Sequence, residues 1–192
     1  MPPKPSVNRD DILNAAITLI RQNGSDSINA RSIAGVLNCS TKPLFRVYEN
    51  MDQLKDDVYD RAMEFYYSFL QNRQTDTIDP FLAVGQNYIE FACQEKELFK
   101  YIFLSNHMSF QSLDEFANLP DIHGLTESIA MSTGLSEQAA KDLFLELWLL
   151  AHGIATMLAT NPSTLDKPEV ERLLIQSFKA QYQYLKSEEP SQ

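Results

Sequence analysis

The sequence IAGVLNCSTKPLFRVY, residues Ile33 to Tyr48, decides how we interpret the fold. Its apolar residues form two short patches at helical spacing, one on each side of Asn38. The pattern predicts one helix from about Ala30 to Leu37 and a second from Thr41 to about Val47, joined by a tight turn. We expect Asn38 to adopt the left-handed conformation that the turn needs, because Asn tolerates it best among residues other than glycine.

The second of these short helices carries a candidate binding surface. We expect Ser40 to cap it and Pro43 to lie in its first turn, where a missing N–H has no cost. Leu44 is expected to face inward, together with Val47 or Tyr48. The outward set consists of Thr41, Lys42, Phe45 and Arg46. Two short helices joined in this way form a helix-turn-helix motif.

This outward face fits the major groove of DNA. Lys and Arg side chains can contact guanine edges or phosphates, and Thr or Pro can contact a thymine methyl group. Arg31 and the capping residue Asn29, at the start of the preceding helix, are placed to hold phosphate. We therefore predict DNA contacts from Asn29, Arg31, Ser40, Thr41, Lys42, Pro43, Phe45, Arg46 and Tyr48.

Charge is distributed unevenly along the chain. The net charge is −10, but residues 1–51 hold six basic and four acidic residues, a balance of +2. The remainder holds 10 basic and 22 acidic residues, a balance of −12. Most of the molecule would therefore repel a polyanion, which leaves the amino-terminal end as its place to bind. Lys4 and Arg9 are expected to reach a neighbouring groove or the DNA backbone.

The rest of the chain favours an all-α fold. Apolar residues recur at spacings of three and four almost throughout, and no convincing run of alternating residues bounded by turn residues is present. We expect about nine helices in two domains: residues 1–51 form the helix-turn-helix domain, and residues 52–192 form a larger helical domain for effector binding and dimerisation. The two cysteines form no CxxC pair, and the amino end lacks the apolar core of a signal peptide. A cytoplasmic protein is the simplest expectation.

The segment from Ile12 to Leu54 resembles the DNA-binding domain of TetR/AcrR-type transcriptional repressors. The match runs without a gap through the first helix, an Ile-Ala pair, the turn, Ser40 and the aromatic residues Phe45 and Tyr48. The resemblance implies a regulator, most simply a repressor, that binds a near-palindromic double-stranded DNA operator as a homodimer. It also implies release of the operator by a small apolar or amphipathic effector.

The sequence departs from the family pattern at four positions. Asn38 replaces a frequent Gly, Phe45 a usual Tyr, Met51 a common Lys and Ala30 a common Thr. Phe45 cannot donate a phenol hydrogen bond to phosphate, and Met51 removes a cation. We therefore expect Arg31, Lys42 and Arg46 to carry more of the salt-dependent binding.

The last two helices are candidates for a dimer interface. The helix from Ser136 to about Ala159 is apolar nearly all round, so it needs neighbours on every side. The last helix, from after Pro168 to about Lys186, covers one side, and a second subunit is expected to cover another in a four-helix bundle. The resemblance also implies dimerisation through the last two helices. The predicted interface residues are Leu150, Ile154, Leu158, Val170, Leu174, Phe178 and Tyr182.

Aromatic residues of the larger domain are candidates for an effector pocket. Core filling is the simpler role for each of them, and a buried, hydrogen-bonded histidine is the simpler interpretation of His152. The family resemblance nevertheless implies an effector pocket in this domain. The candidate residues are Phe65, Phe69, Tyr88, Phe91, Tyr101, Phe103, Phe110, Trp148 and His152.

Other classes of function are less well supported by the sequence. An enzyme built on a helical bundle would need a nucleophile elbow, a phosphate-binding Gly loop, a Glu-x-x-His pair or paired inward carboxylates, and we find none. A helical adaptor that binds protein and has lost DNA binding stays open because of Met51 and Phe45. We expect no metal site, no cofactor and no membrane segment, since Leu143 to Ala159 is short and contains Glu146 and His152.

Overall fold

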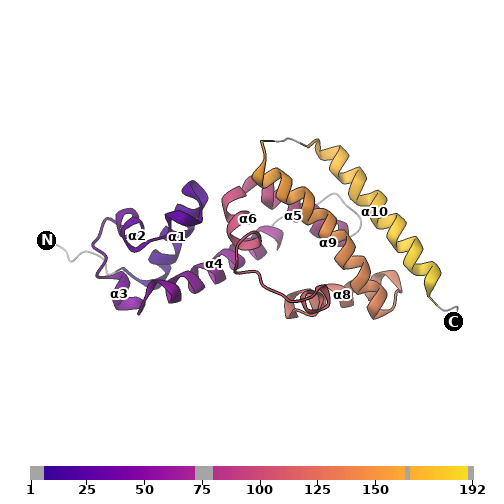
Figure 1. The fold of residues 1–192 in the computed structure, drawn as a ribbon, viewed down its shortest axis with the longest axis horizontal. Coiled ribbons are helices and arrows are strands. Elements are labelled where there is room, and N and C mark those ends of the chain that lie inside the picture. Colours follow the sequence, from indigo (N-terminus) through magenta and orange to yellow (C-terminus); the bar gives the residue numbers. More distant parts are fainter. Residues whose placement is uncertain (1–6, 72–79, 163–164, 190–192) are drawn as a thin grey trace. The chain divides into compact units, whose positions relative to one another are not determined.

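The computed structural model describes residues 7–71, 80–162 and 165–189 (Figure 1). Within these residues it contains ten α-helices, one 3₁₀ helix (η1) and no strand, so the all-α prediction is confirmed. The elements are α1 Arg9–Asn23, η1 Ser25–Ser27, α2 Ala30–Val36, α3 Leu44–Val47, α4 Met51–Gln71, α5 Pro80–Gln94, α6 Lys96–Phe103, α7 Leu113–Ala117, α8 Pro120–Thr133, α9 Glu137–Thr160 and α10 Lys167–Glu188.

The chain divides into two compact units that do not follow a single cut in the sequence. Unit 1 contains residues 1–72 and 94–108, and unit 2 contains residues 73–93 and 109–192. Unit 1 therefore holds α1 to α4 and α6, because α6 packs on α1 and α4. This division differs from the expected boundary at residue 51. The expected boundary separates a DNA-binding domain from an effector-binding domain, and that separation of functions stays a prediction.

Helix α1 begins and ends at clear local signals. The Asn8 side chain accepts a hydrogen bond from the backbone N–H of Asp11, and the Asp11 carboxylate accepts one from the N–H of Asn8. This reciprocal capping box satisfies two donors at the start of the helix. The helix ends at Gly24, whose φ of 78° suits a residue without a side chain. A Cβ there would also lie 3.0 Å from Oε2 of Glu97, so Gly24 allows α6 to approach closely.

The turn between α2 and α3 has the predicted conformation at Asn38, but α3 begins later in the sequence than predicted. Asn38 has a φ of 50°, in the left-handed region. The predicted helix from Thr41 is shorter than expected, because α3 covers only Leu44–Val47. The Thr41 carbonyl accepts hydrogen bonds from the N–H groups of Leu44 and Phe45, so residues 41–43 form a turn before the helix. Pro43, not Ser40, is the residue directly before α3, and no described side chain caps it.

In unit 2, α9 is the central helix and packs against α7, α8 and α10. Leu143, Ala140 and Ala155 are fully buried, whereas Leu149 and Met157 are 46% and 48% exposed. One stripe of α9 therefore faces outward in the single chain. This agrees with the expectation that another molecule covers the remaining face of the helix, and the second subunit itself stays a prediction. By length and composition alone α9 could cross a membrane, but a core helix passes the same test.

Candidate nucleic-acid interface

Two buried side chains fix how α3 presents its other residues. Leu44 is 1% exposed and Tyr48, which follows the helix one turn later, is 3% exposed. Because residues four apart share a helix face, both point into unit 1. Arg46 therefore points away from the interior, and Phe45 and Val47, which are 50% and 37% exposed, lie on the two sides. The geometry agrees with the outward set expected from the sequence.

Tyr48 is the exception among the nine predicted DNA-contacting residues. Its side chain is buried, so it offers no surface to a partner and supports α3 instead. Its hydroxyl lies near Arg9 and Asp57 but makes no hydrogen bond within the described residues. Burial, followed by the nearby Asp57 carboxylate, raises the pKa of Tyr48 to about 12.

Asn29 caps α2 as expected. The cap uses the Asn29 side chain, which we expected to contact phosphate, and two backbone N–H groups at the start of the helix. Its Oδ1 accepts from the N–H groups of Arg31 at 3.1 Å and Ser32 at 2.9 Å. Its Nδ2 donates to the Ser27 carbonyl at 3.4 Å. The Asn29 side chain is therefore engaged within the chain, and its contact with phosphate stays a prediction beside that of the exposed Arg31 side chain.

Arg31, Lys42 and Arg46 form the charged part of what we call the reading surface, together with Phe45. All four residues are exposed. Within the described part of the chain, none of the three cations has an ion pair or a side-chain hydrogen bond. Of the remaining candidates, Ser40 is exposed, and Thr41 and Pro43 are half-buried beside them. The exposed members thus lie on one short segment and on the first turn of α2.

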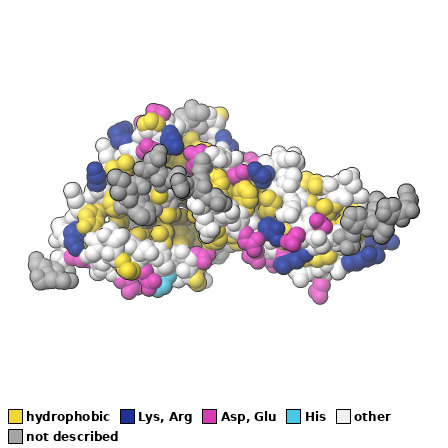
Figure 2. Space-filling model, turned by 180° about the vertical axis from the view of Figure 1, so that it is seen from behind, with side chains coloured by type: hydrophobic (Ala, Val, Ile, Leu, Met, Phe, Trp, Pro, Cys, Tyr) yellow, Lys and Arg dark blue, Asp and Glu magenta, His cyan; other side chains and the backbone are white. Residues whose placement is uncertain are grey.

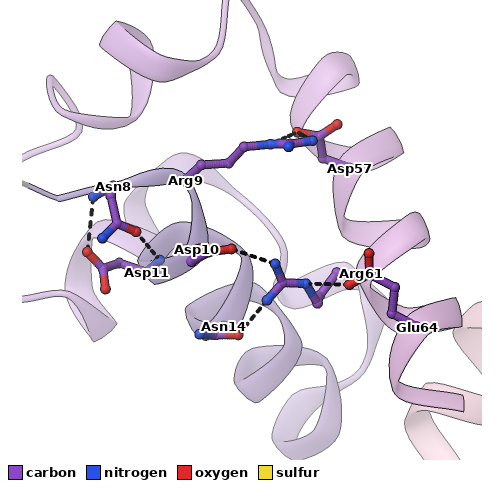
Figure 3. A network of polar contacts seen from close by, with 8 residues as sticks. All are labelled: Asn8, Arg9, Asp10, Asp11, Asn14, Asp57, Arg61 and Glu64. Atoms are coloured by element: carbon purple, nitrogen blue, oxygen red, sulfur yellow. Dashed lines mark hydrogen bonds and ion pairs between the residues drawn. The ribbon is translucent and has the colours of Figure 1, made fainter. Parts of the chain in front are cut away.

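Arg9, which the sequence indicated as a tail contact to DNA, is paired within unit 1. Its Nε lies 2.8 Å from Oδ2 of Asp57 on α4, and this contact raises the pKa of Arg9 (Figure 3). Lys4, the other predicted tail contact, lies outside the described residues. No local pattern could have revealed the Arg9 pair, because its two members are 48 residues apart.

Arg61 forms a second link between α4 and α1 in the same network. Its guanidinium lies 2.6 Å from Oδ1 of Asp10 and 3.1 Å from Oδ1 of Asn14, and it also pairs with Glu64 at 3.0 Å (Figure 3). Figure 2 shows basic side chains in dark blue beside acidic ones in magenta on this unit. Pairing cancels these cations, so they add little to the attraction for a polyanion.

The nine predicted effector-pocket residues fall in both units. Four belong to unit 1: Phe65, Phe69, Tyr101 and Phe103. In that unit the Arg21 guanidinium lies 5.4 Å from the Phe65 ring, and Phe103 packs edge-on against Tyr66 at 5.1 Å. Five belong to unit 2: Tyr88, Phe91, Phe110, Trp148 and His152. One pocket lined by all nine stays a prediction, because the residues belong to two units.

His152 is hydrogen-bonded and half-buried, in agreement with the simpler interpretation. Its Nδ1 lies 2.8 Å from the Tyr88 hydroxyl, and its ring stacks on Trp148 at 4.8 Å between centroids. Burial lowers the pKa of His152, so its neutral form dominates at neutral pH. The ring of Phe116, another aromatic residue that the sequence offers for such a pocket, packs against Trp148 at 4.3 Å between centroids.

Unit 2 also contains a shallow pocket of about 400 Å³, space open to solvent included. Its lining comes from α5, the end of α9 and the residues around the start of α10. The lining residues are Gln86, Ile89, Glu90, Cys93, Leu158, Leu165, Lys167, Val170 and Glu171. Sequence reasoning missed it, since no motif marks side chains that three separate segments bring together.

Three of the seven predicted dimer residues are buried within the chain itself. These three are Ile154, Leu158 and Leu174, on the helices α9 and α10, which pack together. The Tyr182 hydroxyl donates to the Thr133 carbonyl at 3.2 Å. Leu150, Val170 and Phe178 are half-buried. The sequence misassigned these buried residues because the apolar pattern covers more than one face of α9. Helix α10 of the same chain packs against one of these faces. The large apolar residues left exposed on these helices are Leu149, Met157, Leu173 and Tyr184.

An all-helical chain that begins with a helix-turn-helix and continues into a larger helical part has the architecture of a helix-turn-helix transcriptional regulator. Comparison with known families agrees. Residues 81–178, just over half of the 192 residues, match the sequence model of the family described as the tetracyclin repressor-like C-terminal domain. The chain belongs to this family of transcriptional regulators.

Solved structures support the fold. A Pseudomonas aeruginosa PAO1 protein assigned as a transcriptional regulator has a TM-score of 0.63 at 15% identity, covering 95% of this chain and 93% of that one. A TetR transcriptional regulator from Rhodococcus sp. RHA1 has a TM-score of 0.52 at 14% identity, covering 92% and 98%. At these identities the likeness concerns the fold alone. No curated protein matches the sequence.

Proposed function

We propose that this regulator binds double-stranded DNA through α2, α3 and the turn between them, and that it represses transcription from a near-palindromic operator. The observation that carries the proposal is the reading surface, with three exposed cations that have no partner among the described residues. Cations left without partners on a short exposed helix are suited to phosphates and guanine edges. The helix lies at the amino-terminal end of a chain that is acidic elsewhere.

Binding should be strongly dependent on salt. Each phosphate that a cation neutralises adds about −0.9 to the slope of log affinity against log salt. Three cations in each of two subunits give a slope of about −5 if all six contact phosphate. The acidic remainder of the molecule should repel DNA and so favour one orientation of binding.

We propose that the protein acts as a homodimer through α9 and α10. In support, Leu149 and Met157 on α9 and Leu173 and Tyr184 on α10 are large apolar side chains that stay exposed in the single chain. A four-helix bundle with a second copy would bury them. A two-fold dimer would place two reading surfaces about 34–36 Å apart, the length of one turn of DNA.

We also propose that a small apolar or amphipathic effector controls DNA binding. An effector that prefers a state with a different separation of the two reading surfaces lowers operator affinity by the ratio of its affinities for the two states. The aromatic residues around His152 and the pocket beside Lys167 are the two places in unit 2 where such a ligand can be sought.

The decisive experiment is selection of genomic DNA fragments by the purified protein, followed by measurement of affinity against salt. The test variant is Lys42→Ala/Arg46→Ala. The matched control is Lys96→Ala/Lys179→Ala, which removes two exposed cations outside the reading surface. We expect a near-palindromic site that the test variant loses and the control keeps. No enrichment, or weak binding that ignores both variants, would contradict the proposal and favour the protein-binding adaptor.

A further inference from the structure

The exposed aromatic ring on the reading surface points to a specific base contact. We infer that Phe45 packs against the C5-methyl group of a thymine in each operator half-site, and that this contact sets a sequence preference at that position. The inference rests on the proposed function, since it assigns one residue of the same DNA-binding surface a role in reading sequence.

Phe45 is held in place rather than free to fold back. It is 50% exposed on a helix whose orientation the buried side chains of Leu44 and Tyr48 fix. Its own N–H donates to the Thr41 carbonyl at 3.4 Å, which ties its backbone to the preceding turn. The ring therefore stands out from unit 1 without a change in the fold.

The neighbours of the ring favour DNA over an apolar partner. Lys42 and Arg46 are exposed on the same short segment, three residues before Phe45 and one residue after it. A protein surface that buried the ring would have to desolvate these cations or pair them. The DNA major groove offers phosphates to both cations while presenting base edges to a side chain between them. Charge complementarity thus selects the partner.

The chemistry of the ring then selects the base. A phenyl group has no donor or acceptor, so Phe45 cannot read a base edge by hydrogen bonding, nor bind phosphate as a tyrosine would. The one apolar group that the bases present in the major groove is the thymine methyl. Contact between the ring and this methyl removes apolar surface of both partners from water, which favours thymine over cytosine or uracil.

The experiment replaces each thymine of the selected operator with deoxyuridine, one position at a time in both half-sites. This change removes a methyl group and leaves every hydrogen-bonding group in place. We expect one symmetric position at which the change weakens binding of the unaltered protein by about four- to fifteenfold, as for the loss of one or two buried methyl groups.

The same scan with Phe45→Ala identifies the residue that reads the methyl. We expect this variant to bind the operator more weakly and to treat thymine and deoxyuridine equally at that position. Val47→Ala is the matched control, because it shortens another exposed apolar side chain on α3 and should keep the preference for thymine. Circular dichroism melting curves of the variants should coincide with that of the unaltered protein, since both side chains are exposed.

Two results would overturn the inference while leaving DNA binding intact. One is an operator whose affinity is unchanged by deoxyuridine at every position. The other is a thymine preference that persists in Phe45→Ala, which would assign the methyl contact to Thr41 or Pro43. If no specific operator exists, or if Lys42→Ala/Arg46→Ala leaves operator binding unchanged, the proposed function itself fails, and the two failures are therefore distinguishable.

Discussion

Two groups of cations in unit 1 differ in their surroundings. Arg9, Arg21 and Arg61 are each held by acidic side chains, with Arg21 binding both oxygens of Glu95 at 2.7 and 2.6 Å. These pairs join α1 to α4 and to the residue before α6. Arg31, Lys42 and Arg46 are exposed and have no such partners within the described chain. We conclude that the first group connects the elements of the unit, whereas the second is free to contact another molecule.

Reversal of the unpaired charges should have the largest effect. In Lys42→Glu/Arg46→Glu we expect operator affinity to fall by at least about 1,000-fold, because four attractive contacts per dimer become repulsive. Stability should stay within about 0.5 kcal/mol of the unaltered protein, as for other exposed substitutions. Fluorescence anisotropy and urea titration measure the two quantities. A large loss of stability would mean that these cations belong to the first group.

The opposite pattern is expected for a paired cation. Arg61→Ala removes contacts to Asp10, Asn14 and Glu64, and Arg61 is only 27% exposed. We expect the free energy of unfolding to fall by about 1–2 kcal/mol, since several charge-assisted bonds are lost at a partly buried site. Affinity of the folded variant for DNA should change less than about fivefold. The control is Arg31→Ala, which should leave the urea midpoint unchanged and weaken DNA binding.

A paired cation can also be released. Asp57→Asn removes the negative charge opposite Arg9, and the freed guanidinium should then behave as a member of the second group. We expect non-specific DNA affinity to rise about two- to threefold at low salt, with a salt slope steeper by up to about 1 per subunit. The double variant Arg9→Ala/Asp57→Asn should lack this gain. An equal gain in both variants would show that loss of the acidic charge alone accounts for the effect.

His152 lies at a position where the protonated, cationic form of the ring is disfavoured. Burial holds its pKa in the folded state below the ordinary value of 6.5, which the unfolded chain retains. Above that value both states are neutral and no effect is expected. As the pH falls below about 6.5, the unfolded state binds the proton more readily, so the free energy of unfolding decreases.

Urea titrations at several pH values between 7.5 and 5 test this small effect. The carboxylates of the chain also titrate toward the lower end of this range, so the comparison is with His152→Gln. This variant should lose less stability than the unaltered protein over the same range. Equal losses in the two proteins would show that His152 does not contribute to the pH dependence.

Features set by neighbours in the sequence could be predicted, and those set by distant residues could not. The Asn8 cap, the end of α1 at Gly24 and the left-handed Asn38 follow from interactions within four residues. The pairing of Arg9 with Asp57 joins two helices that only the tertiary fold brings together. Sequence reasoning therefore anticipated the exposed face of α3 but not the pairing of Arg9, which it had treated as a free tail contact.

One error arose from a pattern that permits more than one packing. The apolar pattern of α9 does not show which of its faces the same chain covers, so Ile154 and Leu158, which the chain itself buries, were assigned to a dimer. For the inward partner of Leu44 the sequence left Val47 and Tyr48 open, and the structure buries Tyr48 and leaves Val47 37% exposed. The start of α3 was missed because residues 41–43 make helix-like hydrogen bonds without forming the helix.

The position of α6 within unit 1 has a consequence for how this protein can be taken apart or recombined. A fragment that stops at residue 51 would leave α1 without α4 and α6, including the buried side chains of Leu98, Phe99 and Ile102. The segment that completes the unit returns to it only after α5 of unit 2 has been made. We therefore expect that the helix-turn-helix cannot be moved to another protein by itself. A chimaera with another regulator would have to exchange residues 94–108 along with the amino-terminal helices to keep the same interior.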